Sequence, residues 1–208
     1  MPSPTRRDAL RVAAALLTGV AGCSGESSSS SSYPSEPTGN VAFDPESHRL
    51  RNPEPIPLVW TGERPTATDD ESHYHFSGRF FVAGAADVSE VGFADVSGAD
   101  AARDFLDATD YDSETVYVEQ SLVDECFTTT LCHVEWSESD VQTSYARTYR
   151  DADVACETDA RDAVATLIRI PEAFDPREVN SYGSSRGTAP CSVRNDRRRR
   201  PRQEDERR

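Results

Sequence analysis

Two histidines one residue apart, His73 and His75, have the residue type and spacing that a metal site needs. On a β-strand they would point to the same face, about 7 Å apart. Imidazole nitrogens bind transition metals, and the acidic run at residues 69–71 could add oxygen ligands. The spacing therefore allows a metal site, and the alternative is two solvated histidines beside an acidic run.

The adjacent pair Cys132 and His133 is a second candidate, because small blue-copper proteins use both residue types. Their copper is bound by two His, one Cys and usually an axial Met. Met1 is the only methionine of the chain. Neighbouring residues of a strand also point to opposite faces, so they cannot easily share one ion. Copper is therefore not expected at this pair.

The serines of residues 181–187, SYGSSRG, do not form the Gly-x-Ser-x-Gly turn of a nucleophilic serine. We predict a loop here, tied down by Cys191. Paired carboxylates are uninformative, because 32 acidic residues between positions 23 and 193 make accidental pairs unavoidable. The sequence therefore predicts no catalytic residue, and no cofactor other than the metal of the first alternative.

Alternating apolar residues and runs of β-branched or aromatic residues predict six or seven strands. The segments that carry these patterns are 74–82, 89–96, 115–122, 131–136, 142–150 and 163–171. The last segment also allows a helix, but its alternation favours a strand. Segments 115–122 and 131–136 are expected to form an antiparallel hairpin.

One real helix is predicted: Ser97 and Asp100 are spaced like a capping box at its start, an apolar stripe begins at Ala101, and the helix ends near Ala108. Asp175 followed by Pro176 predicts one short turn of helix. Six or seven strands with one packed helix indicate a mostly-β or α+β domain, built on an antiparallel sheet or sandwich.

The N-terminus has the features of an export signal. Arg6 and Arg7 precede an apolar run, residues 9–22, whose only charge is Arg11. This run is too short to span a membrane, which takes about twenty residues, and it suits the core of a signal peptide. The run stops at Cys23, and a serine-rich stretch follows.

Residues 5–10, TRRDAL, resemble a twin-arginine export motif, and residues 20–23, VAGC, resemble a lipobox. The order of arginine pair, apolar run, small residue and Cys is similar to that of haloarchaeal lipoproteins exported by the twin-arginine route. The resemblance implies cleavage before Cys23. It also implies a diacylglycerol on Cys23 that anchors the chain to the extracytoplasmic face of the membrane.

The composition is strongly acidic, with a net charge of −15, and all 22 basic residues are arginines. Between positions 23 and 193, 32 acidic residues face 11 arginines, a net charge of −21. Acidic, lysine-free sequences are similar to those of secreted proteins of halophilic archaea. Such charge repels nucleic acid and opposes compaction unless salt screens it. We therefore expect folding to need high salt, and we expect no nucleic-acid partner.

The cysteines divide into one and four. With Cys23 assigned to lipid, an even number remains, which in an exported protein predicts two disulfides. The four are Cys126, Cys132, Cys156 and Cys191, and their gaps are too long for a zinc knuckle. The favoured pairing is Cys126–Cys132 with Cys156–Cys191. The alternative is Cys132–Cys156 with Cys126–Cys191.

The predicted organisation has four parts: a signal peptide (1–22), a lipidated, flexible Ser/Pro-rich linker (23–55), one globular domain (56–193) and a disordered arginine-rich tail (194–208). The expected function is that of a lipid-anchored surface protein whose domain binds a protein or a small solute without catalysis. The alternative is a cell-surface metal-binding protein or metalloenzyme that uses His73 and His75.

Overall fold

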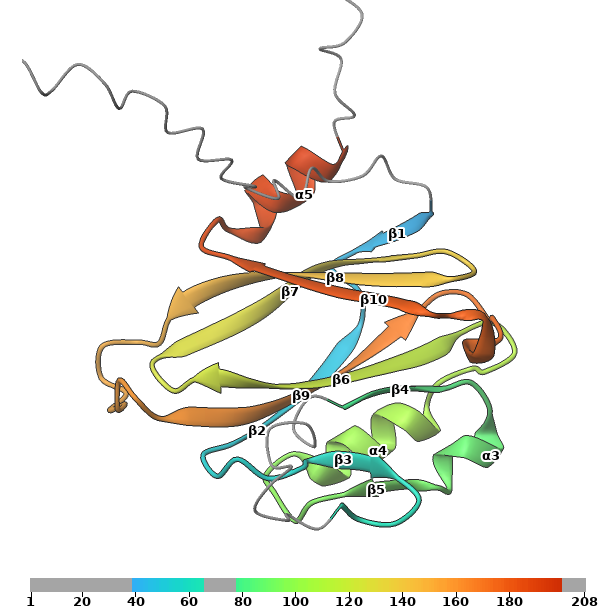
Figure 1. Ribbon diagram of the computed structural model, residues 1–208, viewed down its shortest axis with the longest axis horizontal. Coiled ribbons are helices and arrows are strands. Elements are labelled where there is room, and N and C mark those ends of the chain that lie inside the picture. Colours follow the sequence, from blue (N-terminus) through green and yellow to red (C-terminus); the bar gives the residue numbers. More distant parts are fainter. Residues whose placement is uncertain (1–38, 66–77, 200–208) are drawn as a thin grey trace, which may run out of the picture. The chain divides into compact units, whose positions relative to one another are not determined.

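Two four-stranded sheets packed face to face form the middle of the fold, and a helix covers the outer face of each (Figure 1). The structure, a computed structural model, describes residues 39–65 and 78–199, all within one compact unit, Glu36–Arg208. The predicted class, a mostly-β domain with packed helix and disulfides, is confirmed. Ten strands are present in the described residues, more than the six or seven predicted.

Sheet B is antiparallel throughout, in the order β2-β9-β6-β4. Its strands are β2 (Ser47–Asn52), β9 (Arg161–Ile170), β6 (Thr115–Asp124) and β4 (Arg79–Val82). A layer of small elements covers its outer face (Figure 1), namely α3 (Ala85–Val88), α4 (Ala99–Asp107) and a ribbon of β3 (Val59–Thr61) and β5 (Val91–Phe93). The strand predicted at 163–171, where a helix was the alternative, is therefore confirmed as β9.

Sheet A has the order β1-β7-β8-β10. Its strands are β1 (Asn40–Phe43), β7 (Phe127–Trp136), β8 (Asp140–Tyr149) and β10 (Ser181–Gly187). The last strand runs parallel to β8, while the other pairs are antiparallel. Before β10 comes the predicted short turn, the 3₁₀ helix η1 (Pro176–Glu178) capped by Asp175, and after it α5 (Cys191–Arg199) crosses the outer face of the sheet.

The layer on sheet B is held by an apolar core. Leu106 of α4 is almost fully buried there, together with Val116 and Val118 of β6 and Leu167 of β9. Strand alternation sends Val116 and Val118 to this face and the residue between them, Tyr117, to the other. Burial of such side chains stabilises a fold by roughly 1.5–3 kcal/mol each.

The space between the two sheets has an apolar half and a polar half. Buried apolar side chains fill the first half: Tyr117, Val134, Trp136, Val141, Ile168, Ile170 and Val179. In the second half, one row of paired residues crosses sheet B from edge to edge: Arg49, Thr166, Glu119 and Arg79. Paired residues share a face of the sheet, so this whole row is directed toward sheet A.

Two disulfides are present, as predicted, but they join Cys126 to Cys156 and Cys132 to Cys191, so both pairings proposed from the sequence are wrong. Cys126 directly precedes β7 and Cys132 lies within it. Six residues of extended chain separate two Cα atoms by about 20 Å, whereas a disulfide needs them within about 7 Å. The favoured Cys126–Cys132 pair is therefore excluded by the strand itself.

The predicted hairpin of residues 115–122 and 131–136 is also wrong, because β6 lies in sheet B and β7 in sheet A. Both strands extend further than expected, and only residues 125–126 connect them. The connection from β8 back to β9, residues 150–160, crosses between the sheets as well. The Cys126–Cys156 disulfide thus joins the two crossings.

The boundaries of the folded domain differ from those predicted. Strands β1 and β2 lie within the expected linker, 23–55, and Leu50 of β2 is fully buried. Both strands are short and separated by residues 44–46, so they show too few alternating residues to be recognised. At the other end, α5 is helical to Arg199, and the prediction of disorder is wrong for residues 194–199.

Helix α4 begins later than the proposed capping box requires. Its N-cap is Gly98, not Ser97, and no side chain caps the helix. Gly98 has a φ of 87°, a left-handed conformation that glycine adopts at low cost. A Cβ at this position would also lie 3.3 Å from Leu50. Close approach to β2 therefore determines where the helix starts.

Candidate functional site

The proposed metal ligands His73 and His75 lie outside the described residues, so their prediction stays open. Within 39–65 and 78–199, no three or more His, Cys, Asp or Glu side chains are placed to hold a metal ion. In the same ranges, no helix has the length and apolar character needed to cross a bilayer.

The adjacent candidates Cys132 and His133 have structural partners. Cys132 forms the disulfide with Cys191 at the start of α5. His133 is buried, with Nδ1 2.8 Å from Oδ1 of Asn195 and Nε2 3.2 Å from Oε1 of Glu135. Both ring nitrogens therefore face protein oxygens, and the pair attaches α5 to sheet A.

The segment SYGSSRG, predicted as a loop, is strand β10, so that prediction is wrong. Ser185 accepts a hydrogen bond of 2.8 Å from Arg194 of α5, and its own hydroxyl lies 3.4 Å from the carbonyl oxygen of Thr143. Short polar residues and two glycines hide the strand in the sequence, because they lack the β-branched pattern that marks most strands.

Glu119 is a buried carboxyl whose pKa is shifted by its surroundings. It lies between the two sheets, 6 % exposed, and accepts hydrogen bonds of 3.2 Å from the hydroxyl of Thr143. Burial raises its pKa above the ordinary value, while Arg186 and Arg79 act in the opposite direction. Burial also raises the pKa of Tyr145. Neither side chain lines either of the two hollows described below.

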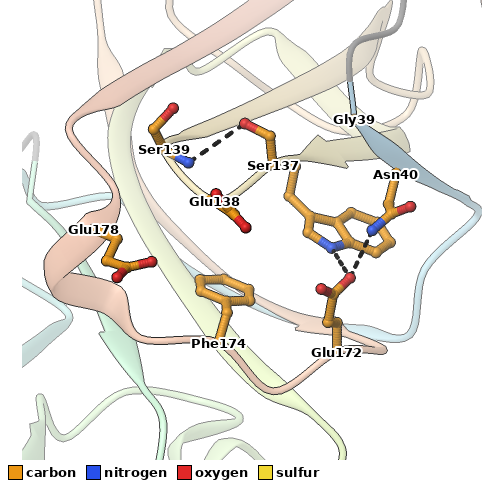
Figure 2. A pocket seen from close by; sticks show the side chains of 9 residues that line it. Gly39, Asn40, Ser137, Glu138, Ser139, Glu172, Phe174 and Glu178 are labelled. Carbon is orange, nitrogen blue, oxygen red and sulfur yellow. Dashed lines mark hydrogen bonds between the residues drawn. The ribbon is translucent and has the colours of Figure 1, made fainter.

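An open hollow of about 640 Å³, which we call the Trp136 groove, lies where β7 meets β8 (Figure 2). Its lining consists of Gly39, Asn40, Trp136, Ser137, Glu138, Ser139, Glu172, Phe174 and Glu178. In Figure 2, the Phe174 ring lies between Glu178 and Glu172, below the open space of the groove. The groove therefore combines aromatic surface with three carboxylates.

One carboxylate of the Trp136 groove has a clear structural role. Oε2 of Glu172 accepts hydrogen bonds of 2.7 Å from the indole Nε1 of Trp136 and from Nδ2 of Asn40 (Figure 2). These contacts join the chain after β9 to β7 and β1. Glu138 and Glu178 are exposed, so they give the rim a negative charge.

A smaller hollow, of about 250 Å³, has the opposite charge, and we call it the arginine cavity. Its lining consists of Leu122, Val123, Asp124, Thr129, Arg147, Arg161 and Arg186. Three guanidinium groups thus come together from β8, β9 and β10, around one carboxylate. The cavity lies at the polar end of the space between the sheets.

The arginine cavity is hard to foresee from the sequence, since its charged residues are up to 62 positions apart (Asp124 to Arg186). One weak signal was present. Arginine is scarce in an acidic chain, with 11 between positions 23 and 193. The positions of these few arginines in the folded protein depend on strand order, which cannot be read from composition.

Comparisons with protein-family models, curated proteins and solved structures found no match to this chain.

Proposed function

We propose that this protein is a lipid-anchored surface protein of the extracytoplasmic face of the membrane, and that its domain acts by binding a protein or a small solute. The anchor would be a diacylglycerol on Cys23, after export directed by Arg6 and Arg7. The proposal rests on the order of these residues around a short apolar run.

The disulfides are the observation that carries the extracytoplasmic assignment. Cys126, Cys132, Cys156 and Cys191 are all paired with one another, and Cys23, outside the described residues, is the fifth cysteine of the chain. Stable disulfides belong to oxidising compartments outside the cytosol. An unpaired Cys directly after an apolar run is the residue that lipidation would modify.

The surface hollows support a binding role. Titratable groups with shifted pKa values mark catalytic sites when they line a cleft. Here Glu119 and Tyr145 are buried between the sheets, while two hollows on the described surface are lined by charged and aromatic side chains. Such a lining suits recognition of charged ligands, and the acidic body makes nucleic acid an unfavourable partner.

Replacing the lipidated residue tests the anchor. For Cys23→Ala, we expect the protein to leave the membrane fraction and to appear in the medium, or to accumulate with its leader uncut. Ser24→Ala, one position later, is the matched control and should stay in the membrane at the mature mass. Membrane fractionation with intact-mass measurement gives both readouts. A Cys23→Ala protein that remains in the membrane at the mature mass would exclude a lipid on Cys23.

A further inference from the structure

We propose that the arginine cavity is a binding site for a small tetrahedral oxyanion, a phosphate or sulfate group. The inference rests on the proposed binding role, to which it adds a site and a ligand class. It does not depend on the lipid anchor, because it concerns residues 122–186 of the folded domain alone.

The charge of the cavity is the first observation. Arg147, Arg161 and Arg186 line it together with a single acidic side chain, Asp124. Its lining therefore carries three positive charges against one negative charge, in a segment whose net charge is −21.

The existing ion pairs do not neutralise the cavity. Asp124 is shared by two arginines, with Nη2 of Arg147 3.4 Å from one oxygen and Nε of Arg161 3.5 Å from the other. A charge-assisted hydrogen bond is shorter, about 2.7–2.9 Å. Both arginines therefore have donors that a second anion can engage.

Two of the three arginines are held in place by other contacts. The guanidinium of Arg147 lies 3.6 Å from the centre of the Phe127 ring, a close cation–π contact. Nη2 of Arg186 donates a 2.8 Å hydrogen bond to the hydroxyl of Ser121, across the two sheets. Donors fixed before binding lose less side-chain entropy when a ligand arrives.

The shape of the cavity favours a tetrahedral ligand over a planar carboxylate. Its three arginines come from three different strands, and a tetrahedral phosphate or sulfate can direct a separate oxygen toward each of them. Guanidinium groups match such oxygens with paired donors. A volume of about 250 Å³ holds one such group with several waters, at about 30 Å³ per water. Glu119, which also acts on Arg186, is buried and does not line the cavity.

Calorimetric titration of the oxidised, full-length protein tests the proposal. The probes are inorganic phosphate, sulfate, glycerol phosphate and, as a planar competitor, acetate, in potassium chloride that keeps the protein folded. We expect saturable binding of phosphate and sulfate, and weaker binding of acetate. Tighter binding of glycerol phosphate would identify a phosphate ester, such as a lipid headgroup, as the source, and equal binding would favour the free anion.

Three variants make the test specific. Arg186→Gln should weaken phosphate binding about tenfold or more, since a hydrogen bond to a charged group is lost. Arg177→Gln, which removes an exposed arginine paired with Asp175, should leave binding unchanged. Asp124→Asn should tighten binding several-fold, because it removes the competing carboxylate.

The variant Asp124→Asn separates a ligand site from a purely structural ion-pair network. A network that only stabilises the fold would lose stability in this variant and gain no affinity for phosphate. The proposal is wrong if no probe binds, if Arg186→Gln and Arg177→Gln behave alike, or if Asp124→Asn weakens binding. None of these outcomes affects membrane fractionation of Cys23→Ala, so the two proposals fail independently.

Discussion

Helices α4 and α5 cover opposite sides of the same sandwich, but they are attached by different forces (Figure 1). Helix α4 buries Ala99, Ala102 and Leu106 against sheet B. In α5 only Asn195 is buried, and the helix ends in three consecutive arginines. Helix α4 is held by the burial of apolar surface, which does not require a specific partner atom at each position.

Helix α5 is instead held by a disulfide and by paired polar groups. Cys191 fixes its first residue to β7. Further along, Arg194 donates a 2.9 Å hydrogen bond to Ser144, Asn195 contacts His133, and Arg198 forms an ion pair with Glu135. Each contact needs its own partner at the right position, so the helix depends on a few specific groups rather than on the total area that it covers.

Removing apolar contact should have the largest effect. Leu106→Ala is expected to lower the free energy of unfolding by about 2–5 kcal/mol, because it leaves a cavity in a closed core. Val193→Ala on α5, where the side chain is 38 % exposed, should change it by less than about 0.5 kcal/mol. Denaturant unfolding followed by circular dichroism gives both values. Equal losses would show that α5 also depends on apolar burial.

Removing the covalent contact should have a smaller effect. Replacing Cys132 and Cys191 together by Ala opens a loop with a sequence separation of 59 residues, and such a bridge contributes about 2–4 kcal/mol. We expect faster trypsin cleavage within α5. The protection of the backbone amides of sheet B against hydrogen exchange should change little. Replacing Cys126 and Cys156 together is the control, because that bridge joins the sheet crossings. If both double variants loosen α5 equally, the attachment proposed for Cys191 is wrong.

The smallest effect is expected from the ionic contact. Glu135→Gln removes the charge that faces Arg198 and should cost about 1 kcal/mol, visible as faster cleavage in α5. Gln142→Glu makes the opposite change to Glu135→Gln, because it adds a negative charge nearby on the same sheet. Added salt should weaken the ionic contact while it screens repulsion in the acidic body. Cleavage rates in α5 and the melting temperature of the protein, both measured over a salt series, would separate the two effects. If added salt changes both in the same direction, the proposed difference between α5 and the rest of the domain is wrong.

The same difference explains what could be predicted from the sequence. Strands β6 and β8, rich in β-branched or aromatic residues, and β9, with alternating apolar residues, were found, and so was the apolar stripe of α4. These elements bury apolar side chains, which leave a periodic pattern. Strands β1, β2 and β10, and helix α5, were missed or placed in loops and tails. Apart from Leu50 of β2, which is fully buried, these elements are held by strand pairing, a disulfide and ionic contacts, none of which is periodic in the sequence.

The sites were harder to predict than the fold, for a related reason. The disulfide pairs depend on which strands share a sheet, and β6 and β7 were wrongly placed together. The arginine cavity likewise collects residues from three strands whose order only the folded structure specifies. By contrast, the existence of two disulfides followed from the number of cysteines alone, which does not depend on topology.

The row of Arg49, Thr166, Glu119 and Arg79 has a consequence for aggregation. Its arginines lie on the edge strands of sheet B, β2 and β4, on the face turned toward sheet A, and each remains partly exposed to solvent at the rim. Exposed strand edges can pair with another copy of the chain, and inward charges on edge strands oppose this because they would be buried in the new sheet. In molar salt, the Debye length falls to about 3 Å, so net charge no longer keeps copies apart. The edge arginines would then prevent association where long-range repulsion cannot.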